Sequence, residues 1–357
     1  SNVAIGWKAM NETTAAGSNV AVGYEALKWG THARTIAIGY QAMYDTNAGS
    51  TSMGSTDNVF LGYQAGGGTW ANAASIKNVA IGNYAMDSAL NGADSNVAVG
   101  YNALSGLTTG DFNIGIGHGA GYDITTGASN IIFGRLAGDT MTTTSNTVLI
   151  GHDAGGAINS TDADGTVAVG SGAGGGITDG RWNTVLGLNA FANATQLDGN
   201  SLIGYNAGVQ LSGSAGATYN THVGYNAGYG QTNKAYNTSI GAEAGYANGG
   251  TTSVSVGYQA GYSFTGTDSV FVGKSAGVNA TLSYHSTVVG LYAGRYLTGG
   301  ANGATYIGAK AGQYASGSNT FIGYRSGEGT TTSAPFSSGI NNTAVGFESH
   351  FSFTTAT

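Results

Sequence analysis

The 357-residue chain has no cysteine, one proline, and only 11 Lys or Arg and 18 Asp or Glu residues. Without cysteine, a disulfide scaffold and a cysteine-based zinc site are both excluded. Apolar residues never run uninterrupted for the length that a transmembrane helix needs, so we expect no membrane insertion of this segment. The net charge of −7 includes few basic residues. Because phosphate binding needs clustered Lys and Arg, we expect no nucleic-acid partner.

Glycine, by contrast, is abundant, with 64 residues, and much of it belongs to a repeat. The phrase Asn-Val-Ala-Ile-Gly at residues 2–6 returns with small changes at residues 19–23, 96–100 and 319–323. Its glycine, called the anchor here, recurs most often every 17 residues, with two gaps of 23. The anchors are Gly6, Gly23, Gly39, Gly62, Gly82, Gly100, Gly117, Gly134, Gly151, Gly170, Gly187, Gly204, Gly224, Gly241, Gly257, Gly273, Gly290, Gly308, Gly323 and Gly346.

The residues around the anchor predict a short strand followed by a turn. The residue before the anchor is always apolar, and the residue three before it is Val, Ile, Thr or Ser. Because side chains alternate along a strand, we expect these two to share one face, directed into the interior. Ala follows three after eighteen of the twenty anchors, which indicates a site with room for a methyl group. The Gly that often comes next is expected to turn the chain, and the Asn that commonly opens the strand to form a ladder.

One such strand cannot bury its own face, whereas stacked copies can. Glycine interrupts every potential helix, and no helical period of apolar residues is present. The sequence therefore predicts an all-β parallel β-solenoid of about twenty coils of roughly 17 residues. We expect a single repetitive domain over residues 1–357, which we interpret as a mature segment or fragment of a longer fibrous protein.

The residue two before the anchor is predicted to point outward, yet it is apolar in most copies. Early copies carry Ala there, and later copies carry larger groups. The large members of this predicted outward stripe are Phe60, Ile132, Leu149, Val185, Leu202, Phe271, Val288, Tyr306 and Phe321. A stripe of this length exceeds the apolar surface that monomers usually expose, which predicts cover by identical chains in a closed homo-oligomer. Cover by the chain's own loops is the alternative.

The repeat resembles the head repeats of trimeric autotransporter adhesins of the YadA type and related repeats of bacteriophage tail fibres. The resemblance rests on Asn-Val-Ala-Ile-Gly-x-x-Ala followed by a glycine-bearing turn, and it covers essentially the whole chain. It implies a left-handed parallel β-roll, three chains side by side in a homotrimer, and a role in attachment. Two features depart from the adhesin heads: the repeat is longer here, and an aromatic residue follows many anchors.

Several strings resemble catalytic or metal-binding motifs. Residues 273–277 match the Gly-x-Ser-x-Gly elbow with Ser275 in the centre, and residues 170–175 resemble a phosphate loop. Both coincide with the repeat and lack the helix that the chemistry needs. Asp162, Asp164 and Asp179 offer carboxylates for a hard cation, but capping of turns is the favoured interpretation. We therefore predict no enzyme, cofactor or metal site.

Two groups of residues are candidates for recognition. His118, Arg135 and His152 follow three consecutive anchors, so they are expected to form one column that suits an anion or an acidic sugar. The alternative is ordinary solvation. The aromatic residues Trp29, Tyr44, Trp70 and Trp182 lie outside the strands, where exposed rings stack on sugars. Packing between loops is the alternative for each. The longest inserts are residues 43–57, 66–77 and 327–341, the last with Pro335.

Four functions compete. The favoured hypothesis is a non-enzymatic attachment fibre or adhesin segment that displays binding loops for a host-surface glycan or protein receptor. Its expected location is extracellular, on a bacterial surface or a virion. The alternative is a structural spacer without a receptor. Binding to ice or another crystal surface ranks lower, because the Thr residues at strand starts are predicted to face inward. An enzyme ranks last.

Overall fold

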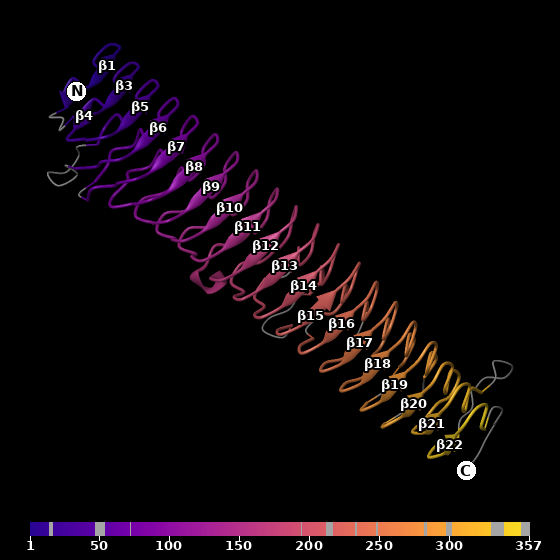
Figure 1. Cartoon of the computed structure of the whole chain (residues 1–357). Helices are drawn as coiled ribbons and strands as arrows, with labels where there is room; N and C mark the ends of the chain where they lie inside the picture. The colour runs from indigo at the N-terminus through magenta and orange to yellow at the C-terminus, as the bar shows by residue number, and fades with distance from the viewer. Residues whose placement is uncertain are drawn as a thin grey trace. The chain divides into compact units, whose positions relative to one another are not determined.

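The structure is a computed structural model that describes residues 1–13, 17–46, 54–71, 73–193, 195–211, 217–232, 234–247, 249–281, 284–297, 302–329 and 339–350. The chain divides into two compact units, Ser1–Trp182 (unit 1) and Asn183–Thr357 (unit 2). Pro335 and parts of all three long inserts lie outside the described residues. Each unit is a parallel β-solenoid, as the repeat predicted (Figure 1).

Unit 1 consists of short strands, nearly all of three residues, which are separated by turns. The strands are β1 (Val3–Ile5), β2 (Glu12–Thr13), β3 (Val20–Val22), β4 (Trp29–Gly30), β5 (Ile36–Ile38), β6 (Val59–Leu61), β7 (Val79–Ile81), β8 (Val97–Val99), β9 (Ile114–Ile116), β10 (Ile131–Phe133), β11 (Val148–Ile150) and β12 (Val167–Val169). One 3₁₀ turn, η1 (Thr161–Ala163), precedes β12.

Unit 2 repeats the same plan with one strand per coil. Its strands are β13 (Thr184–Leu186), β14 (Ser201–Ile203), β15 (Thr221–Val223), β16 (Thr238–Ile240), β17 (Val254–Val256), β18 (Val270–Val272), β19 (Thr287–Val289), β20 (Thr305–Ile307), β21 (Thr320–Ile322) and β22 (Thr343–Val345). The described residues contain no α-helix, in agreement with the sequence analysis.

Neighbouring coils pair in register, so that equivalent repeat positions form columns. In unit 1, Ile131 pairs with Val148 and Phe133 with Ile150. The anchors continue this pairing within each unit, because an anchor N–H donates to the carbonyl before the preceding anchor, as Gly134 does to Ile116 at 2.9 Å. The spacing of about 4.8 Å between parallel strands therefore sets the repeat of every column.

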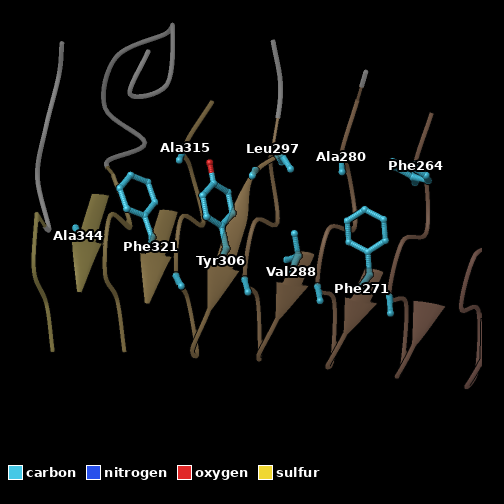
Figure 2. Packing of buried hydrophobic residues seen from close by; sticks show 14 residues of the cluster. Phe264, Phe271, Ala280, Val288, Leu297, Tyr306, Ala315, Phe321 and Ala344 are labelled. Atoms are coloured by element: carbon cyan, nitrogen blue, oxygen red, sulfur yellow. The ribbon is translucent and has the colours of Figure 1, made fainter. Parts of the chain in front are cut away.

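The predicted orientation of the strand faces is wrong. The residue two before the anchor lies in the interior and is buried from β3 onward in every described coil. This interior column includes the whole predicted outward stripe: Phe60, Ile132, Leu149, Val185, Leu202, Phe271, Val288, Tyr306 and Phe321. Figure 2 shows Phe271, Val288, Tyr306 and Phe321 rising from adjacent strands into one core. Alternation fixes which residues share a face, but the fact that both faces are apolar hid which one is inside.

A volume exchange inside each coil explains the range of sizes in the interior column. The second contributor is the residue four after the anchor. In unit 1, Ala80 is followed by the buried Met86, whereas in unit 2 Leu202 is followed by Gly208. A Cβ on Gly208 would lie 3.1 Å from Leu202 Cδ1, so the two positions draw on one space. In these coils close packing allows one large side chain, from either position. The exchange is not uniform, because Val185 and Phe191 are both buried in one coil, whereas Ser255 and Gly261 are both small in another.

A ladder of buried asparagines lies at the start of many strands, as predicted. Asn113 donates from Nδ2 to the carbonyl of Gly127 at 2.8 Å, and its backbone N–H donates to Asn96 Oδ1 at 2.8 Å. Asn130 repeats the pattern toward Asn113 and the carbonyl of Thr144. Each amide thus pairs buried backbone groups that would otherwise be unsatisfied at the corner of the coil.

The anchors are glycines because two coils meet there backbone to backbone. Gly241 has a φ of +131°, and a Cβ on it would lie 2.7 Å from the carbonyl oxygen of Gly257. An L side chain is strained at that φ and would push the coils apart. The Ala three after the anchor is buried, as at Ala137 and Ala260, which confirms the prediction of a methyl-sized site.

Candidate functional surfaces

The first candidate surface is the outer face, formed by the residues one and three before each anchor. None of these side chains is buried in the described strands, and many are exposed, such as Ile131 at 44% and Phe133 at 52%. In unit 1 every one of them is Val, Ile, Leu or Phe. In unit 2 the residue three before the anchor is Thr or Ser in eight coils. Each unit therefore presents a continuous, uncharged sheet face.

The Thr residues at strand starts belong to this outer face, so the prediction that they face inward is wrong. Thr184 and Thr343 are exposed, and the others are half-buried beside the aliphatic members: Thr221, Thr238, Thr287, Thr305 and Thr320. Their position follows from the same inversion as the interior column. The orientation argument against crystal-surface binding therefore does not hold.

The second candidate surface is the turn surface, formed by the residues one, two and five after each anchor. In unit 1 its rings stack along the column Trp7, Tyr24, Tyr40 and Tyr63. Tyr24 and Tyr40 lie 5.0 Å apart between centroids with planes 7° apart. Such stacking follows directly from the strand spacing, because one ring per coil is brought to van der Waals contact with the next.

Polar side chains that follow β3, β5 and β6 form mutual hydrogen bonds on the turn surface of unit 1. Lys28 Nζ donates to Glu25 Oε1 at 2.8 Å and to the Tyr44 hydroxyl at 3.3 Å. Gln41 donates to Glu25 Oε2 at 3.1 Å, and Gln64 donates to Gln41 Oε1 at 3.1 Å. The hydrogen bond from Lys28, together with that from Gln41, lowers the pKa of Glu25. The network occupies the polar atoms that a ligand would need.

The turn surface of unit 2 carries two tyrosine columns. Tyr205 and Tyr225 stack directly after their anchors at 5.4 Å, and Tyr258 lies in the same column. Tyr229, Tyr246 and Tyr262 stack five residues after theirs, at 4.9 and 4.8 Å. The sequence analysis noted aromatic residues after the anchors but not the second column. Its signal is a Tyr that follows the turn glycine in three consecutive repeats.

The predicted His118, Arg135 and His152 column is present at the surface of unit 1. His118 stacks on Tyr101 at 5.2 Å, and Arg135 Nη1 lies 2.5 Å from His152 Nε2. His152 Nδ1 also lies 3.0 Å from a carboxylate oxygen of Asp153. All three predicted side chains are exposed. The geometry brings them together, and their role in anion binding stays a prediction.

The four predicted loop aromatics fall into different environments. Trp70 is fully buried beside Phe60 at 5.6 Å and donates to the carbonyl of Gly66 at 3.1 Å, so its prediction as a surface residue is wrong. Trp29 and Tyr44 are half-buried, each beside the Lys28 ammonium. Trp182 is exposed at 61%, with the Arg181 guanidinium 5.6 Å from its ring.

The residues of the motif-like strings serve the coils. Asp164 Oδ1 accepts from the backbone N–H of Ser145 at 2.7 Å, which confirms a turn-capping role. Asp162 accepts from Arg181 at 3.1 Å. Ser275 is buried in its turn, and its N–H donates to the carbonyl of Tyr258 at 2.8 Å. The described residues contain no group of three or more His, Cys, Asp or Glu side chains arranged to hold a metal.

Buried histidines mark one further difference between the units. In unit 1, His32 contacts the carbonyls of Ser55 and Trp29 at 2.9 and 3.0 Å. In unit 2, His222 occupies the interior column, where its ring is fully buried. Burial lowers the pKa of both imidazoles, that of His222 to about 3.

Comparison with known proteins adds no family assignment. No protein-family model matches the chain, and no curated protein matches its sequence. Among the described residues, no helix is long and apolar enough to cross a membrane.

Proposed function

We propose that the chain is a segment of a trimeric attachment fibre, in which three parallel β-solenoids pack through their outer faces. The observation that carries the proposal is the outer face itself. Its aliphatic side chains, such as Ile38, Ile81 and Ile150, remain exposed on the single chain. Strands that are apolar on both faces are normally buried on both faces.

The size of the outer face supports a stable interface between copies. Ten strands at about 4.8 Å, and three residues at roughly 3.3 Å each, give on the order of 480 Å² for one unit. That matches the largest patch on a typical monomer, roughly 300–600 Å². It is more than half of the roughly 800 Å² that each partner contributes to a standard interface. A second copy of the same face is the partner that the repeat itself supplies.

Three further features of the proposal rest on the resemblance to YadA-type heads and phage tail-fibre repeats. They are the left-handed coil, the number of three chains, and the extracellular location on a bacterium or virion. The nearly uncharged surface gives weak electrostatic steering. Attachment to a glycan or protein receptor would then depend on repeated weak contacts, multiplied by the three copies. The alternative, a spacer without a receptor, shares the trimer but lacks the attachment.

Light scattering coupled to size exclusion tests the trimer. We expect the wild-type chain at three times its own mass, and the variant Ile131→Lys/Ile150→Lys as a monomer. The matched control, Thr126→Lys/Thr143→Lys, adds the same charges on exposed residues away from the outer face of the same coils and should remain trimeric. A monomeric wild type would overturn the proposal, as would a trimeric outer-face variant. Binding of the trimer to target cells then separates an attachment fibre from a spacer.

A second candidate function, binding to ice or another crystalline surface, is favoured by the regular Thr and Ser residues on the outer face of unit 2. Hydroxyl and methyl groups there repeat at the strand spacing. It ranks below attachment because Val254 and Val270 interrupt the row and unit 1 has no such hydroxyls. Thermal hysteresis of the wild-type chain would support it, and its absence would remove it.

A further inference from the structure

Three consecutive coils of unit 2 combine the two tyrosine columns with a polar row. We call this surface the tyrosine patch: Tyr225, Asn226, Tyr229, Glu243, Tyr246, Tyr258, Gln259 and Tyr262. The rings of Tyr229, Tyr246 and Tyr262 are nearly parallel, with planes 2° and 6° apart. Tyr225 and Tyr258 are exposed, and the other members are half-buried.

Backbone hydrogen bonds between coils fix the patch. Glu243 N–H donates to the carbonyl of Tyr225 at 2.8 Å, and Gly230 N–H donates to that of Tyr246 at 2.7 Å. Ala247 repeats the latter bond toward Tyr262 at 2.7 Å. The hydroxyl groups of one column therefore repeat at the strand spacing on a rigid support. A ligand would find them already arranged, which lowers the entropy cost of binding.

The polar row of the patch consists of Asn226, Glu243 and Gln259, which lie two residues after consecutive anchors. Gln259 Nε2 donates to Glu243 Oε2 at 2.8 Å. Asn226 Oδ1 accepts no hydrogen bond from the described residues although that oxygen is buried. Tyr225 and Glu243 are near enough to Tyr246 that their charges, after burial, help to raise its pKa. Unlike unit 1, where Lys28 neutralises Glu25, this row has no paired cation among the described residues.

These groups select a chemical class. The ring faces of Tyr229, Tyr246 and Tyr262 cover one another, whereas Ala242 separates Tyr225 from Tyr258 in the other column. A ligand therefore meets ring edges and hydroxyls of the first column, the rings of Tyr225 and Tyr258, an amide and one carboxylate. All of these pair well with sugar hydroxyls. The carboxylate repels acidic groups, and no member of the patch is a basic side chain for a sulfate, a phosphate or a sialic acid. The nearest position in the column that is basic is Lys274, on the coil after Tyr258. A chain of repeating, uncharged, hydroxyl-rich units matches a surface that itself repeats once per coil.

We propose that the tyrosine patch binds a neutral, linear polysaccharide aligned along the stack of coils. The proposal rests on the attachment function and names its ligand class. It also distinguishes the patch from the coils of β3, β5 and β6, where Glu25, Lys28 and Gln41 bond to one another on the turn surface.

Affinity electrophoresis of the full chain in gels that contain soluble polysaccharides tests the proposal. The neutral probes are dextran, galactomannan and hydroxyethylcellulose, and the acidic probe is alginate. We expect retardation by at least one neutral probe and none by alginate. The variant Tyr229→Phe/Tyr246→Phe/Tyr262→Phe keeps the stacked rings and removes three hydroxyls, so the affinity should fall at least about tenfold. In Glu243→Gln the affinity should fall less, because the new amide can still pair with Gln259.

Two matched controls carry the same chemical change elsewhere. Tyr219→Phe/Tyr236→Phe alters a stacked, exposed pair outside the turn surface. Tyr24→Phe/Tyr40→Phe/Tyr63→Phe alters the stacked column of unit 1. Both should bind like the wild type, and thermal unfolding should place all variants within a few degrees. The proposal would be overturned if no neutral probe retarded the wild type, whether or not alginate did. It would also be overturned if the tyrosine-patch variant were retarded as strongly as the wild type.

The failure of this inference can be told from the failure of the attachment function. A trimeric wild type that attaches to target cells, together with a patch variant that attaches equally well, overturns only the patch. A wild type that binds neither cells nor polysaccharides overturns both. A wild type that binds a neutral polysaccharide through the patch as a monomer supports the patch and overturns the trimer.

Discussion

Units 1 and 2 use one backbone plan with different side chains on both faces of the strand. In unit 1 the outer face is aliphatic apart from Phe133, and the interior residue is mostly Ala, with Met43, Met86 or Leu104 filling the core from the turn. In unit 2 the outer face carries Thr or Ser in eight coils, and most turns have Gly beside an interior column that ranges from Ser255 to Phe271 and Tyr306. The comparison teaches that the fold fixes the backbone approaches between coils and leaves open which position supplies the core side chain.

The largest loss of stability should come from substitution of an anchor glycine, a position at which the two units do not differ. Gly117→Ala in unit 1 and Gly224→Ala in unit 2 each place a Cβ against the next anchor. The Cβ at position 224 would lie 2.5 Å from the carbonyl oxygen of Gly241. Both substituted glycines have a φ near +137°. We expect each to lower the free energy of unfolding by about 5 kcal/mol. Chemical denaturation measures it, with Gly303→Ala, where a Cβ meets nothing within 4 Å, as the control. A cost near 1 kcal/mol at either anchor would contradict the argument.

Acid should destabilise unit 2 through His222. Burial lowers the pKa of this imidazole from 6.5 to about 3. The folded state therefore holds it neutral, so its contribution is fully present above pH 6.5 and is lost as the pH falls from 6.5 toward 3. At the lower limit the loss is roughly 4 kcal/mol relative to a residue that does not titrate. Denaturation of the wild type and His222→Leu at pH 7.5 and pH 4 measures the difference. An equal loss in both would show that His222 takes no part.

The space that Leu104 fills in unit 1 reaches the interior position of the next coil, Gly115, so a large side chain should be transferable between these two coils. Leu104→Ala opens a cavity and should cost about 3 kcal/mol. Gly115→Leu alone should cost about 2 kcal/mol, because its Cβ would already lie 2.8 Å from Leu104 Cγ. The double variant exchanges the two volumes, so we expect it to be more stable than the sum by about 1–3 kcal/mol. Strict additivity of the three denaturation curves would contradict a shared space.

The smallest effect should follow from making the outer face of unit 2 resemble that of unit 1. Thr238→Val/Thr305→Val changes half-buried side chains, so the stability of an isolated chain should stay within about 0.5 kcal/mol. In the proposed trimer the same change should strengthen association, because a hydroxyl no longer has to be desolvated at the interface. Dilution of both proteins in light-scattering experiments compares their dissociation. Weaker association of the variant would argue that the hydroxyls make contacts of their own.

The repeat was sufficient to predict most of the fold. The anchor glycines, the Ala sites, the asparagine ladder and the parallel pairing all follow from one residue type at one position. The direction of the strand faces could not be read the same way, because Val and Ile lie on the outside and Ala or Leu on the inside. The cue lay in pairs of positions: Ala80 with Met86 against Leu202 with Gly208. Volumes that compensate must share one space.

The candidate surfaces were predictable in part. The column of His118, Arg135 and His152 follows from consecutive anchors, whereas Trp70 was misjudged because a long insert does not reveal which of its residues turns inward. The hydrogen bonds that close the turn surface of unit 1 depend on side-chain conformations of Glu25, Lys28 and Gln41, which no sequence pattern specifies. The same holds for the unpaired oxygen of Asn226 in unit 2.

The backbone hydrogen bonds that join each coil to the next also determine how each unit would carry a load. Val97 N–H donates to Asn113, Ile114 to Asn130 and Ile131 to Thr147, each bond spanning one coil boundary. A pull along the stack puts the same tension on every boundary, so the weakest boundary parts first and the coils separate one after another. A pull across the stack loads many boundaries together. Either unit would thus yield gradually under axial tension and resist sideways shear, which is the behaviour of a shock absorber.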